Sequence, residues 1–197
     1  HDWGAFAANA VAAYPNSPFG SVVSMAVPPL AAMSQAKFSP ARTARMGLIQ
    51  LRMSWYIMYF QLPGLPERTL HRVIPGLWRD WSPAGTDVAG DVATTLAALP
   101  TPEHRAAAVG YYRALVRPGG IGAPYAEFDW YLRELPCAPI LYLHGTDDGA
   151  MQVGYTEQLL NALPAGSAVR IIDGAGHFLQ VDRPAEVAAA ILDHVGN

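Results

Sequence analysis

PILYLHG (139–145) and AVRIID (168–173) are the two stretches that decide the fold of this chain. Both are short apolar runs bounded by proline or glycine, as expected of buried strands. Residues 151–163 lie between them and have the composition of a helix, and residues 183–195 form a second helical stretch with a proline in its first turn. Strand, helix, strand and helix in succession predict right-handed crossovers. Residues 139–195 are therefore expected to contribute to a parallel sheet with helices on both faces.

The same pattern is present at the start of the chain, before a different middle region. Residues 4–13 are rich in alanine and favour a helix, and GSVVSMAV (20–27) is a short apolar run typical of a buried parallel strand. Residues 28–127 contain clusters of aromatic residues between proline- and glycine-rich breaks, with helical spacing and hardly any alternation. The middle region is therefore predicted to be a helical insertion.

These patterns predict one interrupted core and one insertion. We expect residues 1–30 and 131–197 to form a single α/β core, with residues 31–130 inserted as a helical cap. Only three strands can be counted, and so small a parallel sheet cannot cover its faces and edges. We therefore expect the first strands of the sheet to be missing from the chain.

Three ionisable residues follow predicted strands or precede a helix, where reactive groups collect in open parallel sheets. Asp2 stands before a helix with Gly4 close behind it, as in a nucleophile elbow, although Asp2 taken alone favours a helix cap. Asp148 follows the strand at 139–145, and His177 lies on the glycine-flanked loop after the next strand. Nucleophile, acid and base in this order match an α/β-hydrolase triad. Asp147 is the alternative acid, and its distance from the preceding strand makes it second choice.

The three motifs resemble one enzyme group. HDWGA (1–5), GTDD (145–148) and GAGHF (174–178) resemble the α/β-hydrolases with an aspartate nucleophile, namely epoxide hydrolases and haloalkane dehalogenases. The resemblance extends over essentially the whole chain, from the elbow through the cap to the last helix. It implies the α/β-hydrolase fold.

The resemblance also gives each residue a role. An Asp2 carboxylate attacks a saturated carbon and forms an alkyl ester, and His177, oriented by Asp148, activates the water that hydrolyses this ester. The backbone N–H of Trp3, at a helix N-terminus, is expected to stabilise the oxyanion. In the family a second N–H donor comes from an HGxP-like loop before the elbow, and this sequence does not contain that motif.

Two segments of the insertion resemble cap segments of epoxide hydrolases, in which one tyrosine from each points at the epoxide oxygen. These are WYIMYFQLPG (55–64) and GYYRAL (110–115), and the match falls on Tyr56 and Tyr112. A tyrosine hydroxyl is protonated at neutral pH and can donate to the alkoxide that forms when an epoxide opens. The two tyrosines are therefore predicted proton donors.

Other aromatic residues near these positions have weaker assignments. Tyr59 and Tyr111 are the less favoured neighbours of the predicted donors, and ordinary helix packing remains an alternative for all four tyrosines. Trp3, Phe60 and Phe178 are predicted to line the substrate pocket.

Composition excludes several kinds of partner. The net charge is −3 with scattered arginines, and no apolar run reaches the roughly 20 residues that span a bilayer. Neither nucleic acid nor a membrane is therefore an expected partner.

No histidine pair has zinc-ligand spacing and no glycine-rich phosphate loop precedes a helix, so no metal or cofactor is expected. A single cysteine favours a reducing, cytoplasmic location. The sequence does not predict an oligomeric state.

The sequence thus predicts an epoxide hydrolase that makes a vicinal diol through a covalent aspartyl ester. A haloalkane dehalogenase is the first alternative, because the two groups share the nucleophile, acid and base. An inactive remnant or ligand-binding module is the second. Halide release without a diol product would favour the first alternative.

Overall fold

A parallel three-stranded sheet forms the centre of the fold in the computed structural model, which describes residues 1–117, 131 and 133–196. Its strands are β1 (Val22–Met25), β2 (Ile140–Gly145) and β3 (Ala168–Ile172), in the order β1-β2-β3. Both pairings are parallel, and all six residues of the central β2 are buried. The three predicted strands are confirmed, and the positions before and after the helical insertion lie side by side in one sheet.

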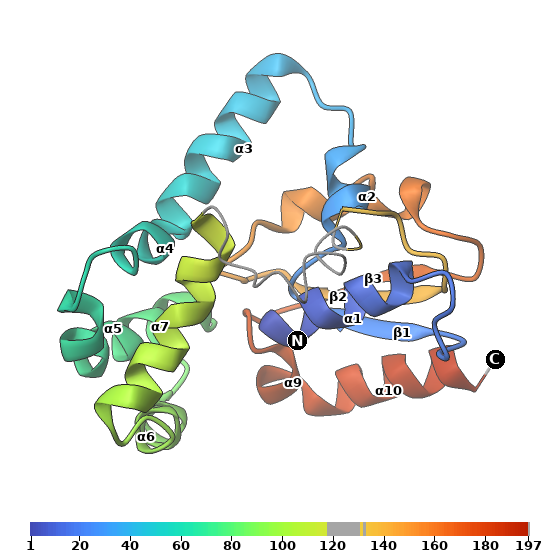
Figure 1. The fold of residues 1–197 in the computed structure, drawn as a ribbon. Coiled ribbons are helices and arrows are strands. Elements are labelled where there is room, and N and C mark those ends of the chain that lie inside the picture. Colours follow the sequence, from blue (N-terminus) through green and yellow to red (C-terminus); the bar gives the residue numbers. More distant parts are fainter. Residues whose placement is uncertain (118–130, 132, 197) are drawn as a thin grey trace.

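Helices cover both faces of this sheet (Figure 1). They are α1 (Trp3–Ala13), α2 (Leu30–Ser34), α9 (Leu179–Asp182) and α10 (Pro184–Val195). Leu141 and Leu143 of β2 pack in one apolar cluster with residues of α9 and α10. Ile140 and Tyr142, the alternate residues of the same strand, pack in another cluster with residues of α1 and α2. Because side chains alternate along a strand, β2 supplies the core on both faces, and the predicted fold class is confirmed.

A second group of helices, here called the helical layer, gathers to one side of the sheet in Figure 1. Its members are α3 (Pro40–Met53), α4 (Trp55–Tyr59), α5 (Leu65–Trp81), α6 (Ala89–Ala97) and α7 (Pro102–Val116). Ser39 and Thr101 cap α3 and α7, and each cap is followed by a proline at the first helical position. Of these, α4, α5, α6 and α7 pack around an aromatic and aliphatic cluster that also includes Ala150, from the loop after β2. The helical character predicted for 28–127 holds for the described residues, while part of the predicted cap, 118–130, lies outside them.

The helix predicted at 151–163 is wrong. This segment contains two 3₁₀ turns instead, η2 (Val153–Thr156) and η3 (Leu159–Ala162). Gly154 lies inside the first turn, and glycine is about 1 kcal/mol less favourable than alanine in a helix. Gln158 between the turns exchanges two hydrogen bonds with the backbone of Lys37, so a tertiary partner fixes the segment in this shape.

Within the described residues, no helix is both long enough and apolar enough to cross a membrane.

Candidate active site

Asp2 occupies a strained backbone position directly before α1. Its φ of 47° and ψ of −121° lie outside the regions that ordinary residues prefer, and its side chain makes no capping hydrogen bond to the helix. The helix-cap interpretation therefore fails, and the carboxylate is left free to point elsewhere. Strained conformations of this kind cost about 1–3 kcal/mol and cluster at functional sites. Trp3 is the first residue of α1, so its backbone N–H is among those without an intrahelical partner.

Asp148 and His177 form a buried pair that joins the loop after β2 to the loop after β3. Oδ2 of Asp148 accepts a hydrogen bond from Nδ1 of His177 at 3.0 Å. The other carboxylate oxygen accepts from the backbone N–H groups of Ala150 and Met151, at 2.7 and 2.9 Å. Three donors thus hold the Asp148 carboxylate in one orientation. Asp147, the alternative acid, is exposed and interacts with Thr146 instead.

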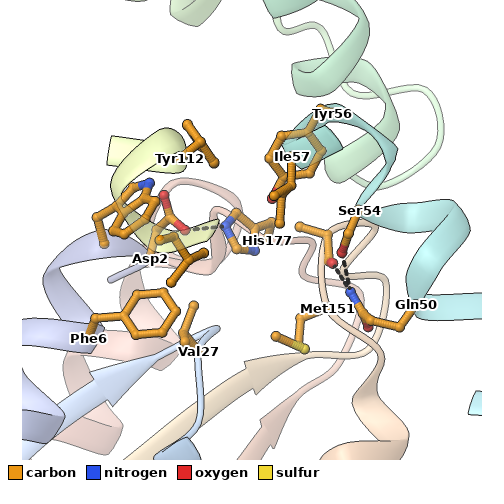
Figure 2. Close-up of a pocket in the computed structure, with 13 residues that line it drawn as sticks. Asp2, Phe6, Val27, Gln50, Ser54, Tyr56, Ile57, Tyr112, Met151 and His177 are labelled. Carbon is orange, nitrogen blue, oxygen red and sulfur yellow. Dashed lines mark hydrogen bonds and ion pairs between the residues drawn. The ribbon is translucent and has the colours of Figure 1, made fainter. Parts of the chain in front are cut away.

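The other ring nitrogen of His177 faces Asp2. Nε2 lies 3.7 Å from Oδ1 of Asp2, the pair joined by a dashed line in Figure 2. Burial opposes protonation of His177, but its hydrogen bond to Asp148 and the charges of Asp148 and Asp2 outweigh burial and raise the pKa of His177 to about 9. His177 is therefore a cation at neutral pH.

Tyr56 and Tyr112 complete the lining around these groups. Both line a cavity of about 80 Å³ together with Asp2, Trp3 and His177. The two phenol rings meet edge to face, with centroids 5.5 Å apart. Figure 2 shows them above Asp2 and His177, on the side of the helical layer. Four of the five predicted catalytic residues therefore line one cavity, and the fifth, Asp148, lies behind His177.

Both phenols are held in the protonated form. Burial raises the pKa of Tyr56 well above its ordinary value of 10, and the nearby Tyr112, Asp2 and Asp148 add to this shift. Burial and the Asp2 charge raise the pKa of Tyr112 to about 12, against a hydrogen bond with Trp3 that favours the phenolate. Each tyrosine can therefore donate a proton to an oxygen in the cavity at neutral pH.

The segments that carry the two tyrosines are joined by hydrogen bonds. Nε2 of Gln61 donates to the Tyr112 carbonyl at 3.0 Å. The Arg113 guanidinium donates to the carbonyls of Phe60 and Leu62, at 3.1 and 2.7 Å. These bonds fix the end of α4 against α7 and so set the spacing of the two phenols.

The remaining predicted aromatic residues lie in other places. Tyr59 hydrogen-bonds to Thr69, and Tyr111 is mostly exposed, so neither lines the cavity. Trp3 does line it, as predicted. Phe60 and Phe178 do not, and their assignment to this pocket needs correction. The Phe60 ring packs on that of Tyr112 within the helical layer, and Phe178 stacks on Trp78 with ring centroids 3.7 Å apart.

Two contacts to His177 were missed by the sequence analysis. The His1 Nε2–H donates to the His177 carbonyl at 2.8 Å, and the His177 N–H donates to the carbonyl of Trp81 at 2.7 Å. The Trp81 contact joins the end of α5 to the loop that carries His177. No local signal predicts it, because the two residues are far apart in the chain. His1 adjoins the predicted nucleophile, and this adjacency was the one available hint.

Glycines make the approach of α5 possible. A Cβ added at Gly176 would lie 2.3 Å from the Trp81 carbonyl oxygen, and one at Gly149 would lie 1.8 Å from that of Asp80. The last turn of α5 therefore sits directly against the loops of both Asp148 and His177.

In the part of the chain that the structure describes, no group of three or more His, Cys, Asp or Glu side chains could hold a metal ion.

Comparison with known proteins identifies a family and a relative. Residues 1–190 match the model of a family described as the alpha/beta hydrolase family. The chain is 29% identical over 218 residues to epoxide hydrolase A of Mycobacterium tuberculosis (strain ATCC 25618 / H37Rv), an alignment that covers 98% of this chain and 66% of that protein.

Solved structures agree in fold. A candidate epoxide hydrolase from Klebsiella pneumoniae subsp. pneumoniae MGH 78578 superposes with a TM-score of 0.73 at 21% identity, over 99% of this chain and 64% of that one. A loop variant of the haloalkane dehalogenase DbeA from Bradyrhizobium elkanii gives 0.66 at 20% identity, over 98% and 65%. The chain thus spans about two thirds of the length of each of these relatives.

Proposed function

Because the chain belongs to the alpha/beta hydrolase family, we propose that it is the part of an epoxide hydrolase that carries nucleophile, base, acid and proton donors. One observation carries the proposal: the Asp2 carboxylate, the His177 imidazole and two protonated phenols line one cavity. A carboxylate and a base are common to both epoxide and halide chemistry. The pair of phenols distinguishes them, because an opening epoxide needs a proton and a departing halide does not.

In the first step of the proposed reaction, an Asp2 carboxylate oxygen attacks an epoxide carbon and the carbon–oxygen bond of the ring breaks. The oxygen released from the ring takes a proton from Tyr56 or Tyr112. The product of this step is an alcohol joined to Asp2 as an ester. The tyrosinate regains its proton from the His177 cation, directly or through water.

The same step prepares His177 to act as a base. Asp2 is one of the two groups that raise the pKa of His177, and esterification removes its charge. The pKa of His177 therefore falls when the ester forms, and the imidazole becomes neutral at the point where a base is needed. The hydrogen bond from Nδ1 to Asp148 keeps Nε2 of His177 directed toward the ester.

The second step hydrolyses the ester. Neutral His177 takes a proton from water, and the hydroxide adds to the Asp2 carbonyl carbon. The Trp3 backbone N–H is the proposed donor to the resulting oxyanion. Collapse releases the diol, whose oxygen takes the proton from His177. The proton left on the Asp2 carboxyl passes to His177, which restores the starting charges.

A single turnover in ¹⁸O-labelled water tests this route. With protein in excess over a terminal epoxide, the first turnover should place ¹⁸O in the Asp2 carboxylate and leave the diol unlabelled. A labelled first diol would mean that water attacks the epoxide directly. Release of halide from a haloalkane without epoxide hydrolysis would favour a dehalogenase, and no turnover of either substrate would favour a binding module. The cytoplasmic location stays a prediction.

A further inference from the structure

One side of the cavity wall carries a polar pair that the proposed reaction does not use. Gln50, near the end of α3, and Ser54, between α3 and α4, both line the cavity. In Figure 2 they lie across from Phe6 and Val27, beyond His177 as seen from Asp2. Atoms of a substrate that extend away from the nucleophile in that direction would meet this pair.

The Gln50 side chain has no hydrogen-bonding capacity left for a ligand in its amide group. Its Nε2 donates to Oγ of Ser54 at 2.9 Å and to the carbonyl of Ala150 at 2.7 Å. Its Oε1 accepts from the backbone N–H of Gln152 at 3.2 Å and from the side-chain Nε2 of Gln152 at 3.4 Å. Both amide protons are used, so the orientation of the Gln50 amide is fixed between α3 and the Asp148 loop.

Ser54 is in a different situation. Its Oγ accepts from Gln50, and the described residues contain no acceptor for its own O–H. Its backbone is fixed on both sides, since its N–H donates to the Gln50 carbonyl at 2.8 Å and its carbonyl accepts from Ile57 at 3.0 Å. Ser54 is therefore an oriented donor in the cavity wall with its proton still available.

The surroundings of Ser54 make this donor selective. Ile57, Ala150 and Met151 line the cavity beside it, and they offer apolar side chains. A substrate that buries an alkyl chain here leaves the hydroxyl proton without an acceptor, whereas an oxygen in the chain satisfies it. A site discriminates against a substrate that lacks the acceptor, because binding then removes the protein's donor from water and leaves it unpaired.

We propose that Ser54 is a specificity-determining residue that donates a hydrogen bond to an acceptor oxygen on the epoxide's side chain. The substrate class is then an aliphatic epoxide with an ether or similar oxygen near the ring. This inference rests on the proposed epoxide hydrolase function and adds the kind of substituent that the site prefers.

The experiment compares substrates of equal shape in the full chain. Ethyl glycidyl ether and 2-(2-methoxyethyl)oxirane each replace one methylene of 1,2-epoxyhexane with oxygen, at two positions along the side chain. We expect kcat/KM for at least one ether to exceed that for the alkyl epoxide by roughly 3- to 10-fold, the range of one net hydrogen bond. Ser54→Ala should abolish this preference, because it removes the hydroxyl that an ether oxygen satisfies and an alkyl chain leaves unpaired.

Two further variants keep the result interpretable. Ser54→Thr retains a hydroxyl and should retain the preference, and Ser34→Ala removes a serine that does not line the cavity and should change nothing. An unchanged thermal midpoint for Ser54→Ala excludes a folding defect. An equal rate on all three epoxides, or a preference that survives in Ser54→Ala, would overturn the role of Ser54 and leave the proposed function standing. Failure of the wild-type protein to hydrolyse any of the three would count against the proposed function itself.

Discussion

The backbone N–H of His177 donates to the carbonyl oxygen of Trp81 at 2.7 Å, so the proposed base is hydrogen-bonded to the last turn of a helix in the helical layer. The Trp81 ring also packs on His177 and on Tyr56, with centroids 5.1 Å away in each case. Trp81 thus contacts both the proposed base and a proposed proton donor. The relative position of these two groups depends on how closely α5 approaches the loop.

Gly176→Ala tests that approach. The new Cβ would lie 2.3 Å from the Trp81 carbonyl oxygen, a backbone atom that cannot move aside without displacing α5. We expect a loss of roughly 1–3 kcal/mol in unfolding free energy, measured by urea denaturation, and a fall in kcat. Gly90→Ala in α6 is the control, because its Cβ meets nothing within 4 Å and alanine favours a helix. A Gly176→Ala protein as stable and active as the wild type would contradict the contact.

Asp148→Asn should lower kcat by about 10³- to 10⁴-fold, because a neutral amide neither holds the required tautomer of His177 nor stabilises its cation. Asp147→Asn is the matched control, since this neighbour is exposed and does not contact His177. Steady-state epoxide hydrolysis by the two variants provides the comparison. Equal losses would mean that the acid is assigned to the wrong aspartate.

His177→Gln should separate the two chemical steps. Asp2 can still attack the epoxide, but no base remains to activate water, so the ester accumulates. Intact-protein mass spectrometry should show an increase equal to the mass of the substrate, and Asp2→Asn added to the same variant should remove it. Continued turnover of His177→Gln without an adduct would argue against the covalent route.

Replacement of Tyr56 or Tyr112 by phenylalanine should slow ester formation by about 10- to 100-fold each, and replacement of both by about 10²- to 10⁴-fold. The reason is that one phenol can still donate when the other is missing. Pre-steady-state quenching of intrinsic fluorescence on mixing with epoxide measures the step. Tyr59→Phe is the control, because its hydroxyl bonds to Thr69 outside the cavity. An unchanged rate in the double variant would show that both residues only pack.

The raised pKa of His177 also predicts how stability depends on pH. A cation favoured in the folded state stabilises it fully below the unfolded pKa of about 6.5, and this contribution is lost as pH rises through about 9. The difference corresponds to about 3 kcal/mol. The difference in unfolding free energy between the wild type and His177→Gln, measured by urea denaturation between pH 6 and 10, should show this decline. Asp2→Asn should move the decline to lower pH. A difference that does not vary over this range would disprove the shift.

Sequence patterns predicted the parts of this molecule that follow from local periodicity. The three strands and the positions of Asp148 and His177 at their carboxyl ends needed no tertiary information, because parallel strands bring these ends to one edge. The resemblance to epoxide hydrolases predicted Tyr56 and Tyr112, which line the cavity. Helical spacing alone would not have separated them from Tyr59 and Tyr111.

Features that depend on tertiary contact could not be predicted. The segment 151–163 has helical composition, but the bonds of Gln158 to Lys37 hold it in 3₁₀ turns. Phe178 follows His177 directly, yet its ring turns to stack on Trp78 and leaves the cavity. The importance assigned to Gly176 comes from the arrival of Trp81, a residue distant in the chain.

The seating of the α5 turn between the Gly149 and Gly176 loops limits how this protein can be re-engineered. A chimaera that exchanges the helices of one hydrolase for those of another assumes that these helices pack independently of the rest of the protein. Here the graft boundary cannot fall inside Asp80–Ser82, because those backbone atoms support the loops beneath them. Helices taken from a donor protein would need a turn of the same shape, and the recipient protein would have to keep both glycines.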